Sequence, residues 1–297
     1  MSKVVFYFSG TGNSLYVARL LSDELGFSCQ SITEYLNGEV YEVDLTQIVL
    51  VFPMYNHSYP LIVREFISKL SMQGLLKNTH ISAVCTYGND LGITLIQLEI
   101  LLKYFGASLS LGYGIQMPYN YVEPSGFKLR GLYDSFIVKE YTDMEVDSAN
   151  KAAEKKINSI KSQIANKANA ELEATSVFIE TIVDKLGMQD TIQKKVWAKV
   201  AGTNVVKDES FYDMVKHMDD GFTVTEKCVG CGICSSICPV GNISQGTDEN
   251  PKFNNNCEQC FACISWCPSE AIEFRRSTVG RSRYHNPKVT IADMIEK

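Results

Sequence analysis

The 297-residue sequence lacks an apolar leader, and no apolar stretch in it is long enough to cross a membrane. The first residues run directly into an apolar strand pattern, which is not how a signal peptide begins. The longest apolar stretch, around residues 92–102, is interrupted by Gln97 and Glu99. We therefore expect a cytoplasmic protein with no membrane span.

The chain also lacks an excess of positive charge. It carries 28 Lys and Arg against 34 Asp and Glu, and the net charge of −6 argues against nucleic acid as a partner. Ser-His-Asp, paired-carboxylate and His-Glu-x-x-His arrangements are absent as well. His57 is a weak candidate for catalysis, because a loop histidine could protonate a cofactor or a substrate. More often such a histidine makes only a surface or hydrogen-bonding contact.

Two cysteine runs near the C-terminus carry the strongest signal. Each has the spacing C-x2-C-x2-C-x3-C followed by proline, which is the bacterial spacing for a [4Fe–4S] cluster. In proteins with two such runs, the fourth cysteine of each run binds the cluster of the other. The expected ligands are Cys228, Cys231, Cys234 and Cys267 for the first cluster, and Cys257, Cys260, Cys263 and Cys238 for the second.

Zinc sites and a disulfide scaffold are the alternatives for these cysteines. Zinc usually takes its ligands as two pairs, which the regular third and fourth cysteines fit poorly. Disulfide scaffolds belong to small secreted domains, and nothing in this sequence indicates secretion. The two remaining cysteines, Cys29 and Cys85, are expected to be buried thiols. Iron–sulfur clusters would also suggest a reducing, anaerobic cell.

Residues 223–274 resemble a bacterial-type ferredoxin with two [4Fe–4S] clusters, including Asn242-Ile243 after the first run and Ala271-Ile272 after the second. The two halves repeat at about 29 residues. The resemblance implies a small α+β fold with two neighbouring clusters. Since the core of such a fold is tiny, the form without clusters should be largely unfolded. The acidic composition of this segment favours redox partner proteins with basic docking patches.

Residues 1–168 alternate short apolar strands with amphipathic helices, which favours a parallel sheet covered by helices on both faces. Parallel sheets bind ligands at the carboxyl ends of their strands, beside the point where the strand order reverses. The loops after the first, third and fourth strands are therefore the candidate binding loops. The expected strands are 3–8, 28–33, 47–52, 80–86 and 108–116, and the expected helices are 13–25, 60–71, 94–105 and 148–168.

The loop after the first strand has the composition of a phosphate-binding loop. Its small residues let the backbone close around a phosphate, its hydroxyls can donate, and a helix N-terminus follows. A dinucleotide-binding loop would need glycine where Leu15 stands, and a Walker A loop would need a lysine that is missing. The pattern resembles the loop that holds the phosphate of FMN in flavodoxins. Its residues are Ser9, Gly10, Thr11, Gly12, Asn13 and Ser14.

Two further loops resemble those that flank the flavin ring in flavodoxins. The loop after the third strand offers flat or polarizable side chains, and the loop after the fourth has glycines that permit close approach. With the phosphate loop, they lead us to expect FMN and a flavodoxin-like, doubly wound, five-stranded sheet of order 2-1-3-4-5. The residues expected to bind the cofactor here are Pro53, Met54, Tyr55, Asn56 and His57 in one loop, and Thr86, Tyr87, Gly88, Asn89 and Gly92 in the other.

The expected domains are a flavodoxin-like domain at 1–168, a helical connecting segment at 169–219, a ferredoxin domain at 220–275 and a basic tail at 276–297. The connecting segment, with a helical pattern over 177–200, is too apolar for a free linker. Residues 118–147 lack periodicity and could cover the flavin or simply pack. The tail could fold back on the ferredoxin domain, reach the flavin domain, or stay solvated. The sequence leaves these alternatives open.

As a whole the chain is similar to the flavodoxin–ferredoxin fusion proteins of anaerobic bacteria and archaea. This resemblance implies an electron-transfer protein that passes single electrons between two [4Fe–4S] clusters and FMN, and on to a redox partner protein. The alternative is a flavin-dependent reductase whose small-molecule substrate binds over FMN. No nicotinamide-binding segment is visible, so direct oxidation of NADH is not expected. The donor, the acceptor, the direction of flow and the oligomeric state stay open.

Overall fold

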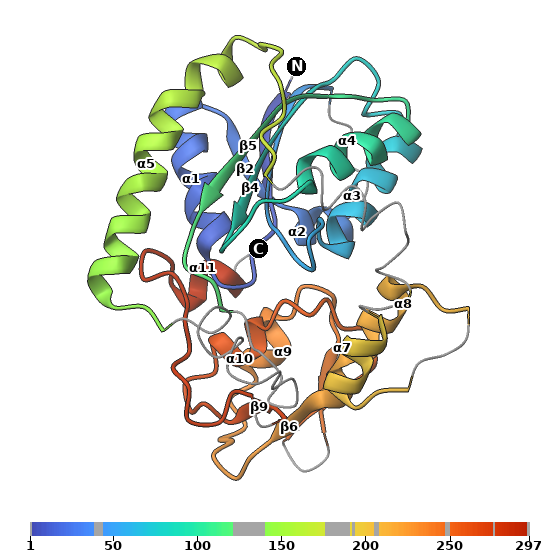
Figure 1. The fold of residues 1–297 in the computed structure, drawn as a ribbon, viewed down its shortest axis with the longest axis vertical. Helices are drawn as coiled ribbons and strands as arrows, with labels where there is room; N and C mark the ends of the chain where they lie inside the picture. The colour runs from blue at the N-terminus through green and yellow to red at the C-terminus, as the bar shows by residue number, and fades with distance from the viewer. Residues whose placement is uncertain are drawn as a thin grey trace. The chain divides into compact units, whose positions relative to one another are not determined.

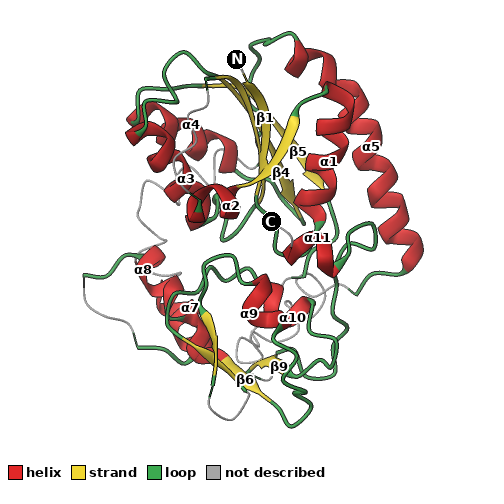
Figure 2. Ribbon diagram, turned by 180° about the vertical axis from the view of Figure 1, so that it is seen from behind, coloured by secondary structure: helices red, strands yellow, loops and turns green. Residues whose placement is uncertain are grey.

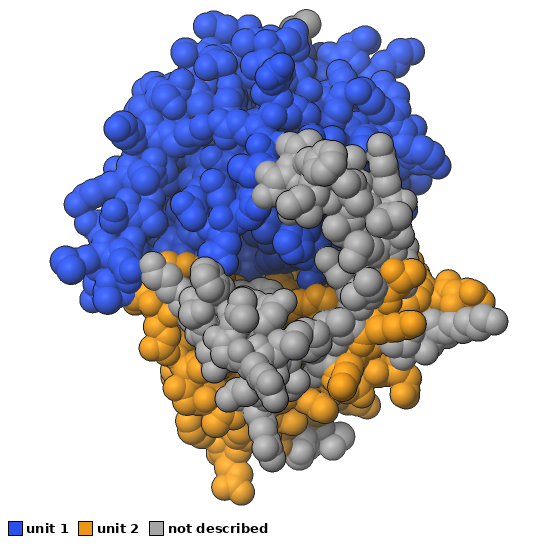
Figure 3. Space-filling model, viewed as in Figure 1, with its two compact units in different colours: residues 1–118, 142–180, 286–297 blue, residues 119–141, 181–285 orange. Residues whose placement is uncertain are grey.

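A computed structural model describes residues 2–38, 44–120, 140–175, 191, 194–204, 208–246, 250–275 and 277–295. Most of the segment 118–147 and the first half of the helical pattern at 177–200 lie outside these residues. The chain divides into two compact units, which Figure 3 colours separately. Unit 1 comprises residues 1–118, 142–180 and 286–297, and unit 2 comprises residues 119–141 and 181–285. Among the described residues, no helix has the length and apolar character needed to cross a membrane.

Unit 1 is built on a five-stranded sheet of order β2-β1-β3-β4-β5, in which every neighbouring pair is parallel. Residues of β3 and β4 are buried almost throughout, because helices cover both faces of the sheet. This order and connectivity confirm the expected flavodoxin-like, doubly wound fold. The strands are β1 (Ser2–Tyr7), β2 (Ser28–Ser31), β3 (Leu45–Pro53), β4 (His80–Tyr87) and β5 (Leu109–Gln116).

The helices of unit 1 form two layers around this sheet. Figures 1 and 2 show α1 and α5 side by side on one face, and α3 and α4 on the other. α5 begins earlier than the sequence pattern predicts, because Thr142 and Glu145 form a reciprocal capping box ahead of it. The helices are α1 (Asn13–Leu25), α2 (Ile32–Asn37), α3 (Leu61–Met72), α4 (Thr94–Tyr104), α5 (Asp143–Ala165) and the short α11 (Ile291–Ile295).

Unit 2 is made of short elements, with a helix followed by a strand in each half of the ferredoxin-like repeat. β6 pairs antiparallel with β9, and β7 pairs antiparallel with β8. Four phenylalanine rings, with centroids 5.0–5.8 Å apart, pack between these two strand pairs. The elements are α7 (Lys194–Ala201), α8 (Phe211–Lys216), the 3-10 helix η2 (Met218–Gly221), β6 (Phe222–Val224), α9 (Ile233–Ile237), β7 (Ile243–Gln245), β8 (Pro251–Phe253), α10 (Ala262–Ser265) and β9 (Ile272–Phe274).

The compact units divide the chain differently from the boundaries expected at 168, 219 and 275. Residues 170–175 belong to unit 1, because their backbone N–H groups donate to carbonyls of β5 and of the loop after β4. α7 and α8 belong to unit 2. The tail is split, since residues 277–285 belong to unit 2 and residues 286–295 to unit 1. The first part of the tail thus packs within the ferredoxin-like unit, and the second part packs within the flavodoxin-like unit.

The two cysteines outside the runs lie in the sheet of unit 1. Cys85 on β4 is fully buried, as expected, and burial raises the pKa of its thiol. Cys29 on β2 is half-buried, and burial raises its pKa to about 11. Both thiols therefore stay protonated at neutral pH, which makes them poor metal ligands or nucleophiles.

Candidate cofactor sites

The loop after β1 presents the N-terminus of α1 at the carboxyl edge of the sheet. α1 begins at Asn13, and no side chain caps it. Gly12 precedes it with φ +89°, a left-handed conformation that glycine adopts without strain. Its N–H donates to the Ser9 hydroxyl over 3.0 Å, which curls the loop back on itself. This geometry is typical of an anion-binding helix terminus.

Hydrogen bonds join the first loop to neighbouring strand ends. The hydroxyls of Ser14 and Thr86 lie 2.8 Å apart, and both side chains are buried. The structure thus brings together predicted residues of the first and third loops. The Asn13 side chain is used inside the protein, since its Nδ2 donates to the carbonyl of Pro118 over 2.6 Å and its Oδ1 accepts from Asn286. The backbone of Asn13 is then the part that can serve an anion.

The loop after β3 contains a tight turn. Tyr55 and Ser58 exchange two backbone hydrogen bonds, of 2.9 and 2.8 Å, across Asn56 and His57. Both turn residues have left-handed backbones, with φ of 50° and 60°, which is uncommon outside glycine. His57 is exposed at the tip of this turn. Its catalytic role stays a prediction.

The loop after β4 is held by Thr175, which lies in the expected connecting segment at 169–219. The N–H of Gly92 donates to Asp90 and to the Thr175 hydroxyl, over 3.1 and 2.9 Å, and that hydroxyl also bonds Asp90. Gly92 has a left-handed backbone with φ +57°, so it has a structural reason to be glycine that is separate from any cofactor. The side chain of Gln116 donates to the carbonyl of Gly88 over 2.8 Å. The sequence did not indicate that Asp90 and Thr175 interact, because the two residues lie 85 positions apart.

In unit 2 the eight cysteines of the two runs line two cavities, four to each. Each cavity takes three cysteines from one run and the fourth from the other, which is the distribution that the spacing predicts. The empty volumes are about 470 Å³ and 320 Å³. The first cavity is lined by Cys228, Cys231, Cys234 and Cys267, and the second by Cys238, Cys257, Cys260 and Cys263.

The thiols surround a hollow, as the ligands of a cluster would, each bonding a different iron. Among the described residues, no group of three or more His, Cys, Asp or Glu side chains is arranged around one metal position. Burial, followed by neighbouring cysteines, raises the pKa of Cys257 and Cys263 well above the usual range. Burial therefore favours the protonated thiol at both positions, and bound iron would stabilise the thiolate form.

Backbone amides donate to sulfur in both halves of the repeat. The N–H of Asn242 donates to Cys238 Sγ and the N–H of Ala271 donates to Cys267 Sγ, each over 3.3 Å. Each donor is four residues beyond its cysteine, so these contacts are equivalent in the two halves. Gln259 donates to Cys257 Sγ over 3.2 Å. Such bonds stabilise charge on cluster sulfur and help set the potential.

The two cavities differ in exposure. Cys231 is exposed, and Val229 beside it keeps 70% of its surface accessible. Cys257, Cys260 and Cys263 are each less than 10% exposed, at 9%, 8% and 8%. The first cavity is therefore the more accessible to a partner or to solvent.

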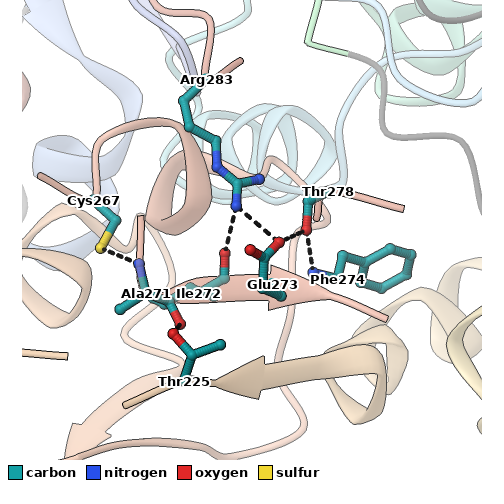
Figure 4. Close-up of polar contacts among 8 residues, drawn as sticks. All are labelled: Thr225, Cys267, Ala271, Ile272, Glu273, Phe274, Thr278 and Arg283. Carbon is teal, nitrogen blue, oxygen red and sulfur yellow. Dashed lines mark hydrogen bonds and ion pairs between the residues drawn. The ribbon is translucent and has the colours of Figure 1, made fainter. Parts of the chain in front are cut away.

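A buried ion pair supports the strand beside Cys267 (Figure 4). Arg283 Nη2 and Glu273 Oε2 are 2.8 Å apart, and their side chains are only 8% and 10% exposed. The same guanidinium donates to the carbonyl of Ile272, and the Thr278 hydroxyl also bonds Glu273. Arg283 lies in the basic tail, so part of that tail neutralises a buried carboxylate.

A second buried carboxylate, Asp219 on η2, lies beside the second cavity. Its Oδ2 accepts from Asn242 Nδ2 and from the N–H of Asn255, both over 2.8 Å. Within the described part of the chain, its Oδ1 has no hydrogen-bond partner. Asn242 in turn donates to Cys238 Sγ, so a two-step hydrogen-bonded link joins Asp219 to a predicted cluster ligand. Asp219 stood in the expected connecting segment, where no motif marked it.

Comparison with known proteins bears directly on unit 2. Residues 223–244 match the family model described as a 4Fe-4S binding domain. Ferredoxin-3 of Chlorobaculum tepidum is 36% identical over 55 residues, which cover 16% of this chain and 89% of that protein. The chain belongs to the 4Fe–4S ferredoxin family. An uncharacterized ferredoxin of Methanocaldococcus jannaschii is 41% identical over 51 residues, and the chain spans 66% of its length.

Solved structures similar to the chain include flavodoxins. Two-electron reduced flavodoxin of Megasphaera elsdenii is 21% identical with a TM-score of 0.33, and the match covers 51% of this chain and 98% of that one. Oxidised flavodoxin 2 of Bacillus cereus is 15% identical with a TM-score of 0.34, covering 55% and 99%. The flavodoxin-like fold of unit 1 is assigned from its strand order and parallel register.

The buried ion pair yields a stability prediction. Glu273→Gln leaves the Arg283 guanidinium buried without a counter-charge, which should cost about 3 kcal/mol. In a unit of this size, that corresponds to a fall of about 10 °C in the temperature at which the cluster absorbance is lost. The measurement is anaerobic thermal bleaching of the metal-loaded full chain.

Two further variants serve as controls for this experiment. Glu226→Gln changes an exposed carboxylate in the same unit and should leave the bleaching temperature unaltered. Replacing both partners, as Glu273→Leu with Arg283→Met, should restore part of the loss because no charge is left buried. A bleaching temperature for Glu273→Gln within a degree or so of the parent would show that the pair contributes nothing.

Proposed function

We propose that this protein transfers electrons between two [4Fe–4S] clusters held in unit 2 and FMN held in unit 1, and exchanges them with a redox partner protein. The division of the eight cysteines around two cavities is the observation that carries the proposal. Each cluster accepts one electron, and FMN accepts one or two. A chain with both can join one-electron to two-electron chemistry.

The residues of unit 2 have distinct parts in this proposal. The cysteines of the first cavity would hold the first cluster, and those of the second cavity the second. The N–H groups of Asn242 and Ala271 stabilise the sulfurs that they reach. The exposure of Cys231 and Val229 favours the first cavity as the place of exchange with a partner.

The residues of unit 1 fit the phosphate and ring of FMN by their chemistry. The N-terminus of α1, with the hydroxyls of Ser9 and Thr11 beside it, supplies donors for one phosphate. Met54, Tyr55 and Tyr87 stand at the carboxyl ends of β3 and β4, where flat or polarizable side chains can flank a ring. The alternative function, a flavin-dependent reductase, needs a substrate site for which residues 118–147 were the expected cover, and residues 121–139 of that segment lie outside the described residues.

An anaerobic reductive titration of the purified protein tests the proposal. With FMN and two clusters bound, uptake should reach about four electrons per chain, with flavin and cluster absorbance changes resolved. Iron analysis should give about eight atoms per chain. About four iron atoms, or no flavin, would contradict the proposed set of cofactors.

The crossed assignment of ligands can be tested with paired cysteine variants. Cys231→Ala with Cys267→Ala removes two ligands of the same proposed cluster, so about four iron atoms per chain should remain. Cys231→Ala with Cys238→Ala removes one ligand from each proposed cluster, so both should be lost. Iron analysis after anaerobic reconstitution measures this difference. If each run held its own cluster, Cys231→Ala with Cys238→Ala would keep about four iron atoms, and Cys231→Ala with Cys267→Ala would lose both clusters.

The charge of Asp219 should lower the potential of the second cluster. Asp219→Asn can keep both hydrogen bonds made by Oδ2, because the new amide nitrogen takes the place of the oxygen that lacks a partner. We expect one cluster potential to rise by an amount on the order of tens of millivolts while the other stays. Anaerobic redox titration followed by electron paramagnetic resonance measures both.

The matched control is Asp220→Asn, which removes the same charge from the next residue at an exposed position. Solvent screening should leave both cluster potentials nearly unchanged there. Equal shifts in the two variants would mean that net charge, not the buried position of Asp219, sets the potential.

A further inference from the structure

The last described residues of the chain form a tail segment, residues 286–295, that packs within unit 1. Asn286 is fully buried, and Val289 and Met294 are each 3% exposed. A solvated basic tail would bury none of these side chains. The tail segment is therefore an integral part of the flavodoxin-like unit.

The tail segment contacts three successive residues of the loop after β1. The N–H of Asn286 donates to the carbonyl of Thr11 over 2.8 Å, and its Nδ2 donates to Asn13 Oδ1 over 3.0 Å. Between them, Val289 lies so close to Gly12 that a Cβ on that glycine would come within 3.1 Å of Val289 Cβ. The tail segment thus contacts the loop at residues 11–13.

These contacts fix the peptide unit between Thr11 and Gly12 from both sides. Its carbonyl accepts from Asn286, and its N–H donates to the Ser9 hydroxyl. Because the peptide unit is planar, the two bonds together determine its orientation. A rotated peptide would turn a carbonyl oxygen toward the anion site, where it would repel a phosphate.

Asn286 is itself held by a network of buried amides. Its Nδ2 also donates to Asn150 Oδ1 on α5 over 3.1 Å, and its Oδ1 accepts from the N–H of Lys288 over 2.9 Å. Asn13, Asn150 and Asn286 are 6%, 2% and 0% exposed. Removing one member of a buried network leaves the others without partners, which costs more than the bond alone.

An ion pair adds a second attachment for the tail segment. Arg19 Nη2 on α1 lies 2.6 Å from Asp293 Oδ1, and the guanidinium holds the pKa of that carboxyl well below its usual range. The Thr290 hydroxyl caps α11 by accepting from the N–H of Asp293, and the Asp293 carboxylate accepts in return from the N–H of Thr290. Since both side chains of the pair are partly exposed, at 43% and 26%, this attachment is the weaker one.

We propose that the tail segment is a positioning element for phosphate binding, with Asn286 as its central residue. Docking of the tail holds the loop of residues 9–14 in the conformation that accepts a phosphate. This inference rests on the proposed binding of FMN. By linkage, a bound phosphate must favour the docked tail as much as the docked tail favours the phosphate.

The test compares FMN with riboflavin, which has the same ring but no phosphate. Asn286→Leu and a chain ending at residue 285 should bind FMN at least about tenfold more weakly. Their affinity for riboflavin should match that of the parent, because the ring-flanking loops are unaffected. Quenching of flavin fluorescence on the cluster-loaded parent and variant proteins measures both dissociation constants. Ala292→Gln, at an exposed position of the tail segment, should behave as the parent.

Because the coupling between the tail segment and phosphate binding is reciprocal, protection of the tail by a ligand tests the inference without a measurement of affinity. FMN should slow removal of the tail segment by carboxypeptidase, and riboflavin at equal saturation should not. Unchanged FMN binding by Asn286→Leu, or an equal loss of FMN and riboflavin binding, would overturn the inference. If the parent protein bound neither flavin, the proposed function would fail instead.

Discussion

The regular structure of unit 2 is short and encloses a small core, so we expect this unit to depend on the bonds that its cysteines make. Its strands have three residues each, and the helices within the two cysteine runs have five and four. Burial disfavours the thiolate form of Cys257 and Cys263, and bound iron would stabilise that form. With the proposed clusters bound, ligation and folding are one process in this unit.

Unit 1 is built on the opposite principle, since its sheet is buried on both faces without any metal. The stable sheet leaves the loops at its carboxyl edge to be shaped by other contacts. Asp90 and Thr175 fix one of these loops, and Asn286 fixes another. Thr175 and Asn286 come from segments far away along the chain, whereas Asp90 belongs to the loop that it fixes. The candidate FMN site is therefore arranged by residues that need not contact a cofactor.

Local patterns in the sequence predicted the parallel sheet, whereas its strand order was predicted from the resemblance to flavodoxins. The alternation of β3 and β4 with helices predicts a parallel sheet, and the cysteine spacing predicts which run supplies the fourth thiol. The positions of Asn286 and Asp219 could not be predicted in this way. Asn286 meets Asn13 across 273 residues, and Asp219 meets Asn242 across 23, with no motif at either end. Single amides and carboxylates in irregular segments carry no periodic signal.

The two halves of unit 2 repeat their backbone but differ in their buried charges. Glu273, next to the strand residues that line the first cavity, is neutralised by Arg283. Asp219, linked through Asn242 to the second cavity, forms no ion pair among the described residues. The second cavity is also the more buried, and a low dielectric strengthens the effect of an uncompensated charge. Burial and negative charge both disfavour adding an electron there, whereas the first cavity is exposed and its neighbouring carboxylate is balanced. With the proposed clusters bound, the two sites would be inequivalent, and an electron would favour the first over the second.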